Sequence, residues 1–337
     1  MRITTNAILR DYKSNLATTI DNLNLSRTHV MTQRSFNSAA EDPAGAARAS
    51  QLHRKYYKVQ DNLSMLEDIQ SRQDGQEDSL TQVSNIVKTI SENYNVQAMS
   101  GDKQTKETRQ TFASAIRQYQ KSMVLSLNSS YEDTFLFAGS DGKNPPFNLS
   151  SDGGTLTYRG INVDASQGTA DDASLTNLSN EKLYVDLGMG LSFDSGDQVV
   201  PSSAFNISLP GIKAIGYGKD KDGVSNNAVV LAGQLADALE SDTFDPVSYG
   251  KLMNKFKDVG TNILNGITDL GVKSEFLTTT KDRLENTNIS LQEQMSKVEG
   301  IDPAAAITEY MWNQYAYNAA LKVGTSILSS SFIDFMR

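Results

Sequence analysis

Three aspartate–proline pairs constrain the fold of this 337-residue chain more than any other feature of its sequence. An aspartate at the N-cap accepts hydrogen bonds from free backbone N–H groups, and a proline at the first helical position loses nothing by lacking its own. We therefore predict a helix start at Asp42-Pro43, at Asp245-Pro246 and at Asp302-Pro303. Proline is otherwise absent from residues 44–144 and from the chain beyond Pro246, as long helices require.

Apolar residues recur at alternating steps of three and four through the proline-free segments. In residues 52–94 they are Leu52, Tyr56, Val59, Leu63 and Leu66, then Leu80, Val83, Val87, Ile90 and Tyr94. A further helix carries Phe112, Ile116, Tyr119, Met123 and Leu127, and the segment after Pro246 carries Leu252, Phe256, Val259 and Ile263. This spacing places the apolar side chains on one face of each helix and is typical of helices that pack as coiled coils.

The middle of the chain has a different character. Residues 139–224 hold 13 of the 23 glycines, and their apolar segments are short, at 155–158, 183–187 and 205–209. Short alternating segments separated by Gly, Asp, Asn and Ser predict strands joined by turns. We therefore expect a small β-rich domain here.

The sequence thus predicts an α+β protein in which the N- and C-terminal arms form a long, coiled-coil-like helical rod, with a β-rich insertion domain in the middle. We assign residues 43–139 and 225–300 to the helical rod domain and residues 140–224 to a solvent-facing insertion. Residues 1–42 and 301–337 form a separate pair of terminal helices. The two arms must pair for the insertion to project sideways.

The terminal helices each carry a narrow apolar stripe. Its members are Ile3, Ile8, Tyr12, Leu16, Ile20 and Leu23 at one end, and Ile307, Met311, Leu321, Leu328, Phe332 and Phe335 at the other. Two isolated helices bury little apolar surface when they pair. The free energy gained is too small to offset the conformational entropy lost when the helices become ordered. We predict that they are loose in the monomer and become ordered on assembly, with these side chains as the subunit interface.

The sequence gives little support for catalytic activity or for metal binding. The chain has no cysteine, and its two histidines, His29 and His53, lie on separate predicted helices. No Walker loop, H-E-x-x-H or G-x-S-x-G motif occurs. Surface turns explain Asp171-Asp172 and the pair Asp194 and Asp197 better than a carboxylate dyad or a calcium loop does. We expect no enzyme activity, no cofactor and no metal.

Charge and hydropathy limit the partners and the location. The net charge is −9 and the pI about 4.9, which argues against nucleic-acid binding. Residues 1–60 carry nine basic against four acidic side chains, which a solvated helix face explains better than a binding site does. The N-terminus lacks the apolar core of a cleaved signal peptide, and no stretch approaches about 18 apolar residues. We expect neither cleavage nor membrane insertion.

Four segments carry a family resemblance. Met1–Asn6 resembles the start of flagellins, and Asn37–Ala46 is similar to their S-A-x-D-D-P-A-G turn. Tyr131–Ser140 is similar to the Y-L-F-A-G signature of the hook-associated protein 3 branch, and Ile327–Arg337 to its S-L-L-D-F-L ending. Each motif alone is weak, but the four occur in the family's order. The chain thus resembles the flagellin superfamily and, within it, the hook–filament junction proteins.

The resemblance implies a function and a set of partners. The terminal helices would line an axial core, and the chain would form a ring of subunits between the hook and the filament of a bacterial flagellum. Its partners would be further copies of itself, a preceding hook-associated junction protein and flagellin. Export would run uncleaved through the flagellar type III apparatus to the cell exterior, with an export chaperone at the C-terminal helices.

Other functions stay open at this point. Flagellin itself, the filament subunit, is the nearest alternative, because the Asp42-Pro43 turn fits both branches. A hydrolase in residues 140–224 and a secreted coiled-coil adhesin are further alternatives. The family segment R-E-L-A-V-Q is matched only by Glu92–Gln97, without its arginine, so we predict no recognition by innate receptors.

Overall fold

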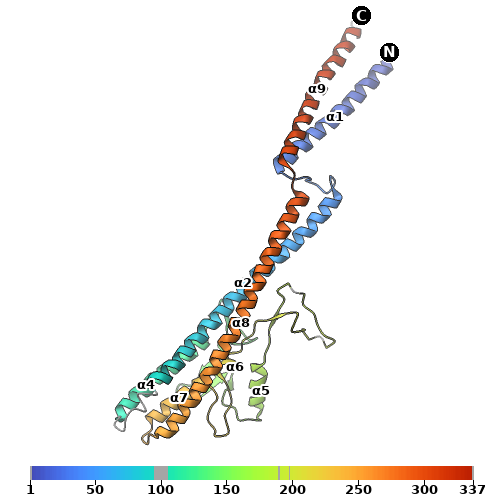
Figure 1. Ribbon diagram of the computed structural model, residues 1–337. Coiled ribbons are helices and arrows are strands. Elements are labelled where there is room, and N and C mark those ends of the chain that lie inside the picture. Colours follow the sequence, from blue (N-terminus) through green and yellow to red (C-terminus); the bar gives the residue numbers. More distant parts are fainter. Residues whose placement is uncertain (1, 95–104, 189, 197, 336–337) are drawn as a thin grey trace. The chain divides into compact units, whose positions relative to one another are not determined.

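A computed structural model describes the backbone of residues 2–94, 105–188, 190–196 and 198–335, and the side chains of these residues except 2–6 and 328–335. The contacts divide the chain into two compact units. We call Met1–Asp61 with Leu284–Arg337 the terminal unit, and Asn62–Arg283 the central unit. Two long helices, α2 (Pro43–Thr89) and α8 (Pro246–Glu299), contribute residues to both (Figure 1).

The three long helices that follow Asp-Pro pairs begin at the prolines. α2 starts at Pro43, α8 at Pro246 and α9 (Pro303–Phe335) at Pro303. Each preceding aspartate accepts a backbone N–H two or three residues later: Asp42 from Gly45 at 2.9 Å, Asp245 from Val247 at 3.0 Å and Asp302 from Ala304 at 2.9 Å. The carboxylates thus satisfy donors that the first helical turn leaves free.

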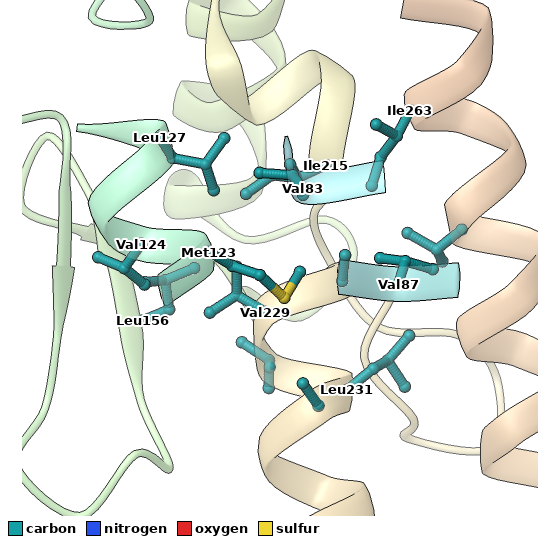
Figure 2. Close-up of a cluster of buried hydrophobic side chains, with 14 of the residues drawn as sticks. Val83, Val87, Met123, Val124, Leu127, Leu156, Ile215, Val229, Leu231 and Ile263 are labelled. Atoms are coloured by element: carbon teal, nitrogen blue, oxygen red, sulfur yellow. The ribbon is translucent and has the colours of Figure 1, made fainter. Parts of the chain in front are cut away.

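Four helices enclose the main core of the central unit. They are α2, α4 (Lys106–Leu127), α7 (Ala228–Glu240) and α8. Figure 2 shows side chains from all four helices, with Leu156, converging on one apolar cluster: Val83 and Val87, Met123, Val124 and Leu127, Val229 and Leu231, and Ile263. The expected apolar faces of α2, α4 and α8 therefore meet within one molecule. A π-helical turn, η1 (Ile90–Tyr94), follows α2 directly.

Helix α7 is an element that apolar periodicity does not reveal. Its first six residues, 228–233, are all buried, and its polar residues Gln234, Asp237 and Glu240 fall only in the second half, so the first half shows no polar face to set a period. Asn227 caps it, because its Oδ1 accepts N–H groups from Val229 at 2.9 Å and Val230 at 3.2 Å. A helical segment that is apolar all round lies within a packed core.

The middle segment contains β structure and two helices. Its strands are short: β3 (Phe147–Leu149), β4 (Leu156–Tyr158) and β5 (Ile161–Asn162) form one antiparallel sheet, and β6 (Tyr184–Val185) pairs with β7 (Phe205–Asn206). A hairpin of β1 (Ser130–Tyr131) and β2 (Thr134–Phe135) precedes them. Helices α5 (Ala170–Ser179) and α6 (Gly211–Ile215) complete the insertion.

The acidic residues singled out in this segment hold local structure. Asp171 and Asp172 lie in the first turn of α5, and Asp172 accepts the N–H of Gly168 at 2.9 Å. Asp194 accepts two backbone N–H groups, from Gly196 at 2.8 Å and from Gln198 at 3.0 Å, which lowers the pKa of its carboxyl. Asp197 lies outside the described residues.

The motif at residues 131–140 packs between the insertion and the helices. Leu136, Phe137 and Ala138 are buried, and the carbonyl of Phe137 accepts the hydroxyl of Tyr158 at 2.9 Å. Burial raises the pKa of the Tyr158 hydroxyl. Gly139 follows with φ of +70°, a backbone conformation that favours glycine. The motif is therefore the point at which the chain leaves the helical core.

Candidate assembly surface

Helices α1 (Arg2–Thr32) and α9 lie side by side in the terminal unit (Figure 1). The pair is antiparallel, because the Tyr12 hydroxyl donates to the carbonyl of Ala320 at 3.1 Å while Asn313 Nδ2 lies 3.5 Å from the carbonyl of Asn22. At Gly324 an added Cβ would lie 2.0 Å from the Tyr12 hydroxyl oxygen. A larger residue there would therefore displace the Tyr12 side chain.

The buried and half-buried side chains of each helix follow a heptad. On α9 they are Ala306, Tyr310, Asn313, Tyr317, Ala320, Gly324 and Ile327, and on α1 they are Leu9, Tyr12, Leu16, Thr19, Leu23 and Ser26. Steps of three and four make this a coiled-coil seam. Small and polar residues make up about half of it, so the pair buries little apolar area.

The side chains expected at an interface divide into two groups. Tyr12, Leu16 and Leu23 are half-buried in the seam between α1 and α9. Ile8, Ile20, Ile307, Met311 and Leu321 face solvent, with 53%, 37%, 48%, 63% and 41% of their surfaces exposed. Ile3, Leu328, Phe332 and Phe335 lie on the helices, but their side chains are outside those described. The seam on α9 is thus shifted by one residue from the apolar stripe read from the sequence.

Further exposed apolar residues surround α9 and the end of α1. Trp312, Tyr315 and Val323 on α9 are more than half exposed, as is Met31 on α1. Sequence reasoning along a single heptad passed over them, although the aromatic content of 310–317 is visible in the sequence. Exposed apolar side chains therefore lie on more than one side of α9.

A clasp joins the two linkers that enter the terminal helices. We define it as Gln33–Ser35 and Glu299–Ile301, which pair through an antiparallel bridge between Arg34 and Gly300. The Ser35 N–H donates to the carbonyl of Glu299 at 2.8 Å, and the Glu299 carboxylate contacts His53 at 2.6 Å and Arg34 at 3.4 Å. The clasp thus fixes the start of α9 to the end of α1.

The second histidine also serves this region. His29 Nε2 lies 3.2 Å from Glu41, whose other contacts are the N–H of Asn37 at 2.9 Å and the Ser38 hydroxyl at 3.1 Å. The Asn37 N–H and then His29 lower the pKa of the Glu41 carboxyl. Each histidine is therefore half of a structural contact with a glutamate. Among the described residues there is no cluster of three metal-ligating side chains, and no described helix could cross a membrane.

The arrangement places the chain among helical proteins whose N- and C-terminal arms pair around an inserted middle segment. Residues 3–141 match the bacterial flagellin N-terminal helical region, and residues 253–331 match the bacterial flagellin C-terminal helical region. Together the two matches cover 218 of the 337 residues. The chain belongs to the flagellin family, a family of flagellar structural proteins.

Solved structures share the fold. A protein assigned as flagellar hook-associated from Vibrio parahaemolyticus superposes with a TM-score of 0.60 at 16% identity, covering 77% of this chain and 100% of that one. Flagellar hook-associated protein 3 from Legionella pneumophila gives 0.50 at 13% identity, with coverage of 74% and 98%. FlgL from Bacillus cereus gives 0.49 at 18% identity, with coverage of 73% and 99%. A comparison with curated protein sequences finds no match.

Proposed function

We propose that this chain is a structural subunit of the hook–filament junction of the bacterial flagellum, and that it assembles through α1 and α9. The observation that carries the proposal is the apolar surface of α9, where Trp312, Tyr315, Met311 and Ile307 are about half or more exposed in a single copy. Covering such surface releases about 25 cal/mol per Å² of apolar area. Neighbouring subunits are therefore the source of the assembly free energy.

The names of the structures with this fold support the junction over the filament. Two solved structures, with TM-scores of 0.60 and 0.50, carry the description hook-associated. We extend that role to this chain, with copies of itself, a preceding hook-associated protein and flagellin as neighbours. Export without cleavage to the cell exterior, with a chaperone on the C-terminal helices, follows from the same role. The terminal helices are then only weakly paired before assembly, and their neighbours fix them afterwards.

Flagellin remains the second candidate, because the family is common to both. Electron microscopy of the purified chain, with and without short flagellin seeds and isolated hooks, separates the two. A junction protein does not grow filaments alone, but hooks that have bound it nucleate flagellin. Long filaments grown from the chain alone would instead identify it as flagellin.

Two substitutions test the surface itself. Met311→Asp and Leu321→Asp each place a charge on α9 where solvent covers it in the monomer, so the monomer should stay folded. Both should abolish binding to hooks while leaving the far-ultraviolet circular dichroism spectrum unchanged. The matched control is Leu125→Asp on α4, whose side chain is 74% exposed but lies in the central unit. Equal binding by all three variants would exclude α9 as the interface.

A further inference from the structure

Helix α2 separates its charges by sign along its length. Its first 18 residues, 43–60, carry Arg48, Arg54, Lys55 and Lys58 and no acidic residue. The next 18, residues 61–78, carry six acidic side chains and one arginine. Composition alone favours a solvated helix face for the basic part. The positions of its side chains favour a binding surface instead.

The basic side chains form one exposed stripe. All four are exposed, and at 100° per residue their positions fall within about 120° around the helix. No carboxylate of the described chain forms an ion pair with any of them; Arg54 contacts only the Ser50 hydroxyl, at 3.4 Å. We call this surface the basic stripe.

The acidic side chains form a second stripe, which follows the basic stripe along the sequence of the helix. Its members, all exposed and within about 140° of one another, are Asp61, Glu67, Asp68, Asp74 and Asp78. Only Glu67 has a cation beside it, Lys281 at 2.9 Å. The one arginine of the segment, Arg72, is half-buried and donates to the Thr134 hydroxyl at 3.2 Å, so it does not neutralise the stripe.

This distribution is unfavourable for an isolated copy. Arg54 and Lys58, and likewise Asp74 and Asp78, stand four residues apart, where like charges on a helix repel. Opposite charges do stand at a helical spacing where the stripes meet, at Lys58 and Asp61, and between Asp68 and the half-buried Arg72. Within each stripe, however, like charges lie together, and a partner of opposite charge removes their repulsion.

We infer that the basic stripe of one copy binds the acidic stripe of the next copy in the assembled ring, an inference that rests on the proposed function. A ring needs a head-to-tail contact, in which two different surfaces of the same chain are complementary. Two separate stripes of opposite sign on one chain meet that requirement. A second copy of the chain carries both surfaces, so its acidic stripe can bind the basic stripe of the first copy and its basic stripe can bind the acidic stripe of another.

Charge reversal with co-assembly tests the inference. One variant carries Lys55→Glu and Lys58→Glu, a second carries Asp68→Lys and Asp74→Lys, and both are added as purified full chains to isolated hooks. Each variant alone should bind about tenfold less than the native chain, because like charges then face each other. An equal mixture of the two should recover native binding, since each reversed stripe meets its complement.

Controls separate this inference from the proposed function. Lys88→Glu reverses an exposed charge of α2 outside both stripes and should bind as the native chain does. The defects should shrink at 1 M salt, where the screening length falls to about 3 Å. If the native chain does not bind hooks, the proposed function fails. The contact between copies is refuted if the native chain binds hooks and the charge-reversed variants bind equally well. It is also refuted if mixing the two variants does not restore binding. If flagellin alone restores the binding of a variant, flagellin is the partner that covers the stripe.

Discussion

Adding one methyl group at Gly233 should destabilise the central unit, although the same change stabilises most helices. Gly233 lies inside α7, where alanine normally gains about 0.5–1 kcal/mol over glycine. Here a Cβ would lie 2.7 Å from Gln120 Nε2 and 2.9 Å from the carbonyl oxygen of Gly153. Both distances are shorter than a Cβ tolerates, and one contact is with backbone.

The cost follows from what must move. Gln120 is buried, and its Nε2 donates to the carbonyls of Gly153 at 2.8 Å and Val229 at 3.0 Å. Overpacking a core costs about 1–3 kcal/mol, and leaving a buried carbonyl without its donor costs about 1–3 kcal/mol more. After the helix gain is subtracted, Gly233→Ala should lower the free energy of unfolding by about 1–5 kcal/mol.

The matched control is Gly271→Ala in α8. An added Cβ there meets nothing within 4 Å, so only the helix gain remains, about 0.5–1 kcal/mol of stabilisation. The measurement is urea unfolding of the full chain followed by far-ultraviolet circular dichroism, comparing midpoints at unchanged slope. Trp312, the single tryptophan, reports separately on the terminal unit by fluorescence. If both alanines shift the midpoint in the same direction, the packing argument around Gln120 is wrong.

Three further changes test other parts of the structure. Asn227→Ala removes the buried cap of α7 and should lower the free energy of unfolding, measured in the same urea experiment, by about 2–4 kcal/mol. A decrease below about 0.5 kcal/mol would mean that water replaces the cap. The hydrogen bond from Arg117 lowers the pKa of Glu240 below its ordinary 4.5, so this contribution is complete above pH 4.5 and is lost as the pH falls through the folded-state pKa. Glu240→Gln should therefore lower the melting temperature at pH 7 and have a shrinking effect below pH 4.5; a pH-independent difference would contradict the assignment. Tyr12→Phe removes a hydrogen bond between α1 and α9, and should lower the midpoint seen by tryptophan fluorescence while leaving the circular dichroism of the central unit unchanged.

The helical arms follow from residues whose effects are local. An aspartate before a proline needs only its own next three residues to start a helix, so the starts of α2, α8 and α9 coincide with the Asp-Pro pairs. Apolar steps of three and four locate α4 for the same reason. The prediction of helical arms around a β-containing middle segment is confirmed.

The elements that sequence reasoning missed depend on distant contacts. The first half of α7 is buried on every side, so it shows no apolar period, and its burial depends on α2, α4 and α8. On α9 the seam includes Ala320 and Gly324, which lie beside Tyr12, whereas Leu321 is 41% exposed. The apolar stripe read along the sequence marks the exposed side instead.

The clasp makes the two linkers mechanically dependent on each other. A bend in residues 33–42 alone would break the bonds from Ser35 to Glu299 and from Ile301 to Gln33, because both partners lie in the other strand of the chain. The two linkers are therefore held together and do not bend independently. A protease that needs unpaired, extended backbone would reach either linker only after the two had separated. The susceptibility of the two linkers to proteolysis is thus coupled.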